Sequence, residues 1–191
     1  MIVLWAMSLW AALIVLAASG FGAHECQKYG LSRGQMIGLA LAVWVLGWWT
    51  WHGSVIRLNF GYVLLTATGW VGVALLGQPR WWLLTPTLAL VALFARILAP
   101  FAPEQASVIP AATIESLGLG VAAGISVGGA FPAALVAAAA EGLSGVLVAI
   151  RNVGVWNFGH YDLVAVMLAT VAAWAVGWVT SGVIQRFSRP A

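Results

Sequence analysis

Ionisable side chains are scarce in this chain, and those inside apolar stretches are the residues best suited to chemistry. Glu141 lies near the middle of one apolar run, Glu115 about one helical turn inside a second, and Arg96 about one turn inside a third. A charged side chain inside a bilayer is costly unless it is paired or hydrated, so each should face a partner or a cavity. Such residues often bind solutes, line ion paths or relay protons.

Further polar side chains lie at the ends of the same apolar runs. If successive runs cross a bilayer in alternating directions, these side chains map to the end of the bundle that carries the N-terminus, and Glu141 lies just below them. The hypothesis is a single pocket of ligand-binding or buried polar residues in that half of the bundle. Its candidate residues are Arg57, Asn59, Arg96, Glu115, Glu141, Arg151, Asn157 and Asp162.

Ion pairing within the bundle is the competing interpretation of these charges. Arg96 with Glu115, or Arg57 with Glu141, could lock helices together without binding any ligand. Charges at helix ends can also extend to water, and a proton relay is a further alternative. Glu141 is the strongest candidate, because alanines and glycines surround it and its partner must come from another helix.

The sequence contains no recognisable metal, cofactor or catalytic motif. His24, Glu25 and Cys26 are adjacent in a polar segment, but this is not the ligand spacing of a zinc motif. No serine lies in a nucleophile elbow, and no glycine-rich phosphate loop follows a strand. We therefore expect no metal and no cofactor. An intramembrane enzyme stays a third functional alternative, since such sites assemble from distant helices.

Composition places the elements that carry these residues in a membrane. Of 191 residues, 63% are hydrophobic and 7% are charged, whereas soluble domains carry about 25% charged residues. Apolar blocks of about 17 to 23 residues match the ~30 Å hydrocarbon core, and lipid favours helices because it offers the backbone no hydrogen-bond partners. The eight basic residues are scattered singly, which argues against a nucleic-acid partner.

We therefore predict an all-α membrane protein with a single polytopic transmembrane domain over residues 1–191, a bundle of about seven helices, six being the alternative count. The predicted spans are 2–19, 35–51, 59–77, 81–99, 110–127, 131–149 and 161–183. The first span lacks the basic start of a signal peptide, so we expect it to be retained.

The distribution of basic residues predicts orientation. Five fall on the face opposite the N-terminus and three on the N-terminal face, so the positive-inside rule favours an outer N-terminus and a cytoplasmic C-terminus in the cell membrane.

Small residues recur every four positions in two consecutive spans. They are Ser116, Gly120, Gly124 and Gly128 in one span, and Ala130, Ala134, Ala138 and Gly142 in the next. Such faces let helix backbones approach closely, so we expect these two spans to pack as antiparallel neighbours. A homo-oligomer contact is the alternative, and the alanines of the first span could contact a partner membrane subunit.

An internal similarity accompanies these spans. Asn59-Phe60-Gly61 opens the third span, and Asn157-Phe158-Gly159 precedes the seventh, 98 positions later. The same shift aligns Ala40 with Ala138. The pattern suggests a parallel repeat of three helices, a linker helix and three helices, a plan that some transporters use.

The layout of the spans, with Glu141, Arg151 and Asp162 late in the chain, resembles the YphA-like family of small Firmicutes membrane proteins. That resemblance implies a polytopic cell-envelope protein, linked in sporulating bacteria to spore formation, without an established biochemical activity. The compact layout is also similar to the substrate-binding subunit of vitamin importers. The leading functional hypothesis is a membrane protein that binds or transports a small solute or ion through the polar pocket, and its main rival is a non-catalytic structural or accessory envelope protein.

Overall fold

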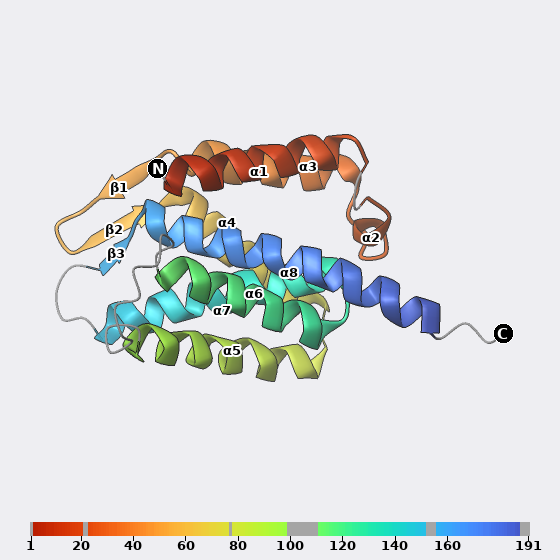
Figure 1. The fold of residues 1–191 in the computed structure, drawn as a ribbon. Coiled ribbons are helices and arrows are strands. Elements are labelled where there is room, and N and C mark those ends of the chain that lie inside the picture. Colours follow the sequence, from red (N-terminus) through yellow and green to blue (C-terminus); the bar gives the residue numbers. More distant parts are fainter. Residues whose placement is uncertain (1, 21–22, 77, 99–110, 152–155, 188–191) are drawn as a thin grey trace.

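The computed structural model describes residues 2–20, 23–76, 78–98, 111–151 and 156–187, and these form a helical bundle (Figure 1). The prediction of a helical architecture is confirmed. The described helices are α1 (Ile2–Ala18), α2 (Ala23–Gln27), α3 (Arg33–Leu46), α4 (Phe60–Leu76), α5 (Pro79–Leu98), α6 (Ala111–Val127), α7 (Ala130–Arg151) and α8 (His160–Phe187). The segment between the fourth and fifth predicted spans, residues 100–109, lies outside the described ranges.

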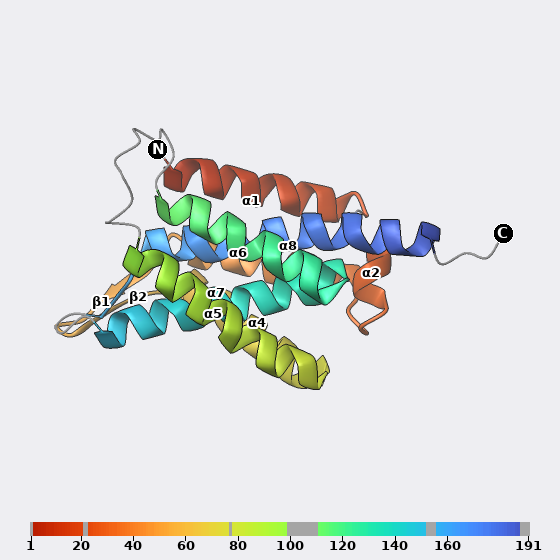
Figure 2. The same ribbon diagram turned by 60° about the horizontal axis from the view of Figure 1, so that its bottom comes forward.

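The seven longer helices run side by side in alternating directions, so α1 begins and α8 ends at opposite ends of the bundle (Figures 1 and 2). α7 is the central helix and contacts α4, α5, α6 and α8. In the most apolar stretch of α7, 72% of the residues are buried, against 28% in the corresponding stretch of α5 on the outside. Alanine-rich α7 suits this position because small side chains let four neighbours approach at once. The hairpin of α1 and α3 covers the opposite edge from α5.

Three described helices are long and apolar enough to cross a membrane: residues Pro79–Leu98, Ala130–Arg151 and His160–Val183. Shorter apolar stretches cover Met7–Ala18, Arg33–Leu46, Phe60–Leu76 and Thr113–Val127. Large apolar side chains point outward from the bundle, including Leu75 at 80% and Leu83 at 73% exposure. An apolar exterior of this kind is favourable in lipid and costly in water.

A small sheet at the N-terminal end of the bundle departs from the purely helical expectation. Strand β1 (Thr50–His52) pairs antiparallel with β2 (Ile56–Asn59), and β2 pairs in parallel with β3 (Trp156–Phe158). The second predicted span, 35–51, therefore ended too late, because α3 ends at Leu46. The apolar run continues through Trp48, Trp49 and Trp51, so hydropathy alone hides the boundary.

A capping box determines where α3 begins. The Ser32 hydroxyl accepts from the Gln35 N–H, and the Gln35 side chain accepts from the Ser32 N–H at 2.8 Å. These bonds satisfy two N–H groups that a helix start leaves without partners. Before it, the segment predicted as a polar linker contains the five-residue helix α2.

α6 and α7 contact each other and run in opposite directions, as the repeating small residues predicted, but the glycine face of α6 makes its closest backbone approach to α8 (Figure 1). A Cβ on Gly120 would lie 2.4 Å from the Ala169 carbonyl oxygen, and one on Gly124 would lie 2.6 Å from Val176 Cβ. α8 offers Ala169 and Ala173, both fully buried, and this gives α6 a closer backbone approach than α7 does.

The small residues of α7 serve other contacts. Ala138 lies against α4, where a Cβ on Gly69 would be 3.0 Å from Ala138 Cβ, and Ala134 is buried at 8% exposure. Gly128 makes no close helix contact. It has φ of +71° directly after α6, the left-handed conformation that favours glycine and ends a helix. Its role is therefore the turn into α7.

We expect Gly120→Val to destabilise the protein by about 1–3 kcal/mol, since the added side chain must displace the α8 backbone. Gly118→Val is the matched control, because nothing lies within 4 Å of a Cβ built there. Thermal unfolding in detergent, followed by tryptophan fluorescence, should show a lower midpoint for Gly120→Val alone. Equal midpoints for the two variants would contradict the packing of α6 on α8.

Candidate functional site

Arg96, Glu115 and Glu141 form a charged cluster where α5, α6 and α7 meet. The Arg96 Nε–H donates to Glu115 Oε1 at 2.8 Å, and its Nη2 donates to Glu141 Oε1. The side chains are 19%, 8% and 1% exposed, respectively. Arg96 lies in the last turn of α5, and Glu141 near the middle of α7, so the long arginine side chain reaches into the bundle to meet both acids.

The cluster carries more negative than positive charge. Two carboxylates share a single guanidinium, and Asp162 at the start of α8 also interacts electrostatically with Arg96 and Glu141. The Ser116 hydroxyl donates to Glu141 Oε1 at 3.4 Å. In the part of the chain that the structure describes, buried Glu141 Oε2 has no hydrogen-bond partner. A buried carboxylate oxygen without a donor favours a proton or another cation beside it.

Asp162 also has a local structural role. Its Oδ2 accepts from the Gly159 N–H at 2.9 Å, three residues earlier, in the first turn of α8. A carboxylate at this position satisfies an N–H at the helix start and interacts favourably with the helix dipole. Asp162 therefore stabilises the start of α8 and adds negative charge near the cluster.

Asn59 is fully buried and joins three segments. Its Nδ2 donates to the Gly47 carbonyl at 2.8 Å and to Thr50 Oγ1 at 3.2 Å, and its Oδ1 accepts from the Tyr62 N–H at 3.1 Å. The last bond makes Asn59 the N-cap of α4. These bonds occupy the carboxamide, so Asn59 supports the architecture around the cluster and does not face a ligand.

Three of the predicted pocket residues lie on the surface instead. Arg57 and Asn157 face each other in register on β2 and β3, and both are exposed. Arg151 is exposed at the end of α7. Within the described ranges Arg57 forms no ion pair, and the partner of Glu141 is Arg96. The structure thus brings together Arg96, Glu115, Glu141 and Asp162, and leaves Arg57, Arg151 and Asn157 outside their cluster.

Tyr62 is a polar residue near this site that the sequence did not single out. Its hydroxyl donates to the Gly142 carbonyl at 3.0 Å, one residue after Glu141, and its ring stacks on Phe158 with centroids 5.3 Å apart. A lone tyrosine within an apolar run was the available signal, since a buried phenol requires a hydrogen-bond partner.

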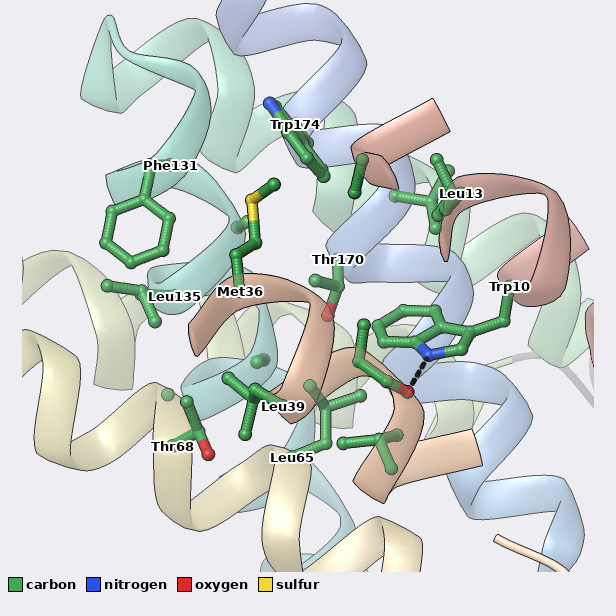
Figure 3. A pocket seen from close by; sticks show the side chains of 17 residues that line it. Trp10, Leu13, Met36, Leu39, Leu65, Thr68, Phe131, Leu135, Thr170 and Trp174 are labelled. Atoms are coloured by element: carbon green, nitrogen blue, oxygen red, sulfur yellow. Dashed lines mark hydrogen bonds between the residues drawn. The ribbon is translucent and has the colours of Figure 1, made fainter. Parts of the chain in front are cut away.

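The charged cluster lines neither of two apolar hollows in the bundle. The two adjoining hollows open between the α1–α3 hairpin and the central helices, and apolar side chains dominate their lining (Figure 3). Across the described residues, no group of three or more His, Cys, Asp or Glu side chains is placed to hold a metal ion.

Burial makes the lone cysteine a poor nucleophile. Cys26 in α2 is 1% exposed, and its thiol lies 3.1 Å from the Met36 sulfur. Desolvation, with a smaller contribution from the negative charge of Glu25, raises the pKa of the thiol from 9.0 to about 11. The thiolate is the reactive form, so a maleimide should label Cys26 about 100-fold more slowly at pH 8 than a free peptide thiol.

Labelling rates measured from pH 8 to pH 10 test this expectation. The rate should still rise about tenfold per pH unit at pH 10, where a free thiol has already reached its plateau. Fast labelling at pH 8 in the folded protein would contradict the burial of Cys26.

Comparison with known proteins identifies no matching family model, no matching curated protein and no matching solved structure.

Proposed function

We propose that this chain is an integral membrane protein whose helices α1 and α3 to α8 all cross the bilayer. Their alternating directions support this, as do the outward apolar side chains and the three helices of sufficient length. α3 has 14 residues and a length of about 21 Å, and α1, α4 and α6 have 17 residues and a length of about 25 Å. A shorter helix is accommodated by local thinning of the bilayer at modest cost.

We further propose that the protein binds or transports a small cation, a proton included, at the cluster of Arg96, Glu115 and Glu141. The observation that carries this proposal is the excess of carboxylates over the single guanidinium, together with the unpartnered Glu141 Oε2. A negative site in a low-dielectric setting attracts a cation strongly. Arg96 would orient both carboxylates and prevent a second cation from binding.

The function test measures cation entry into proteoliposomes under an inside-negative potential, with a pH dye for protons and a sodium dye for Na⁺. We expect the protein to accelerate one of the two, and Glu141→Gln to reduce entry to the rate of protein-free vesicles. Glu25→Gln is the matched control, because it makes the same charge change in an exposed pair with Lys28 at the other end of the bundle. The proposal would be excluded if the wild-type protein conducted neither protons nor Na⁺ and if neither ion raised its unfolding temperature.

The rival function, a structural or accessory envelope protein, is favoured by one observation. Arg96 already pairs with both carboxylates, and these ion pairs join α5, α6 and α7 without any bound cation. On this interpretation Glu141→Gln lowers the unfolding temperature and no cation crosses at any pH. The two measurements, flux and stability, therefore separate the two functions.

The orientation and the internal repeat are parts of the same proposal. The sheet, the start of α1 and the end of α5, whose last turn carries Arg96, lie at one end of the bundle, and we propose that this end faces the outer side of the membrane because of the basic residues at the other end (Figure 1). The two Asn-Phe-Gly segments both lead from a strand into a helix, and their strands β2 and β3 are paired in parallel. This arrangement supports a repeat of three helices on each side of α5.

A further inference from the structure

A continuous apolar groove runs between the α1–α3 hairpin and the central helices. Its two hollows share the side chains of Leu39, Thr68, Phe131 and Leu135, and Figure 3 shows these side chains around the inner hollow. The outer hollow has a volume of about 450 Å³, within the range of small-molecule pockets. The inner hollow extends past Thr170 to Trp10, whose indole N–H donates to the Ala40 carbonyl.

The groove follows from the way α3 meets α4. At the N-terminal end of the bundle the two backbones touch, and a Cβ on Gly61 would lie 2.7 Å from the Gly47 Cα. Further along, Leu39 of α3 and Thr68 of α4 face a hollow between them. The two helices therefore form a wedge that is closed at the sheet and open towards α2.

The groove opens on the outside of the bundle. Leu75 and Val71 line the outer hollow and are 80% and 56% exposed. In a bilayer this face contacts lipid, and water has no hydrogen-bond partners in such a lining.

The end of the groove near α2 is polar and positively charged. Tyr29 lines it, packs on Phe131 with ring centroids 5.4 Å apart, and interacts electrostatically with Glu25, Lys28 and Arg80. Glu25 pairs with Lys28, so the two cations leave one positive charge in excess. Lys28 and Arg80 are exposed, and each keeps N–H donors beyond its bonds within the chain.

We propose that the groove binds one acyl chain of an anionic phospholipid, and that Lys28, Arg80 and the Tyr29 hydroxyl bind its phosphate. The apolar lining matches the chain, and the positive end matches the headgroup. The inference rests on the proposed membrane location and is independent of the charged cluster. The bound lipid would fill the wedge between α3 and α4 and couple the α1–α3 hairpin to the rest of the bundle.

The test is photolabelling in phosphatidylcholine vesicles that contain a trace of phosphatidylglycerol or of phosphatidylcholine with a diazirine in the acyl chain. Peptides carrying Leu39, Thr68 and Leu135 should be labelled more strongly by the phosphatidylglycerol probe, by about fivefold for each basic side chain that contacts the phosphate. Exposed positions on α5, such as Leu83, should be labelled equally by both probes.

Two variants locate the site. Thr68→Trp should fill the groove and remove its labelling, since the Thr68 hydroxyl bonds only within its own helix, to the Leu64 carbonyl. Leu83→Trp adds the same ring on the exterior and should leave groove labelling unchanged. Replacing both Lys28 and Arg80 with Gln should abolish the preference for phosphatidylglycerol. If Thr68→Trp does not fold, Leu39→Phe provides the same test.

The outcomes separate the inference from the membrane proposal. Labelling of Leu83 without labelling of the groove, or groove labelling that both probes produce equally, would overturn the lipid site and leave the membrane location intact. Crosslinks between two copies of the chain at these positions would show that a helix of a second copy, and not a lipid, occupies the groove. The absence of labelling anywhere would refute the membrane location itself.

Discussion

Replacing Arg96 with Met should destabilise the folded protein by about 3–5 kcal/mol, because it leaves two buried carboxylates without their shared partner. Glu141 is 1% exposed and Glu115 8% exposed, so solvent cannot take over the role of the guanidinium. Both acids would then have to be protonated or hydrated inside the bundle. Met is similar in length to the aliphatic part of Arg, which keeps lost packing a minor effect.

The measurement is the unfolding midpoint in detergent, with Arg57→Met as matched control. Arg57 is exposed on β2 and forms no ion pair among the described residues, so its replacement should change stability by no more than about 0.5 kcal/mol. A small effect of Arg96→Met, equal to that of Arg57→Met, would mean that the cluster is hydrated and not buried.

A charge-free variant separates the cost of an unpaired acid from the value of the cluster. Arg96→Met combined with Glu115→Leu and Glu141→Met removes all three charges and should recover most of the lost stability, since buried ion pairs are often no better than apolar residues of similar volume. Such recovery with loss of cation flux would identify the cluster as retained for binding. If the charge-free variant regained stability and also kept cation flux, the cluster would have no functional role.

The sequence predicted the position of this cluster and the pair of Arg96 with Glu115, but not the partner of Glu141. Hydropathy located Glu141, Glu115 and Arg96 inside apolar runs, and alternation of the helices placed them at one end of the bundle. Whether Arg57 or Arg96 would reach Glu141 depended on which helices are neighbours, and spacing along the chain does not determine that. In the structure α5 lies against α7, and Arg57 lies on a strand outside the bundle.

The choice of helix partners was also beyond the sequence. Gly120 and Gly124 indicate a closely packed face, but a stripe of small residues fits any helix with a complementary surface. α6 packs on α8, whose Ala169 and Ala173 are as small as the alanines of α7. The sheet was hidden because residues 48–51 contain three tryptophans, and apolar residues near a bilayer interface look alike in a helix and in a strand.

Replacing Asn59 with Ala should destabilise the protein by about 2–4 kcal/mol, because two buried backbone groups lose their partners at once. The Gly47 carbonyl loses the Asn59 Nδ2 donor, and the Tyr62 N–H loses the Asn59 Oδ1 acceptor. The loss falls where α3 and α4 touch, and a Cβ on Gly61 would lie 2.8 Å from the Val43 carbonyl oxygen at the same crossing. The crossing cannot tighten to compensate, and water has little room to enter.

Asn157→Ala is the matched control, since the same three residue types recur there in a different setting. Asn157 is exposed on β3, and the start of α8 is satisfied by the bond from the Gly159 N–H to Asp162 instead. Its replacement should change the unfolding midpoint little, within about 0.5 kcal/mol. Equal losses in the two variants would show that both segments hold their helices in the same way, as an internal repeat with preserved roles requires. Unequal losses would show that the two copies of the repeated sequence have different roles. The copy with Asn59 would stabilise a helix crossing, and the copy with Asn157 would form only a surface strand.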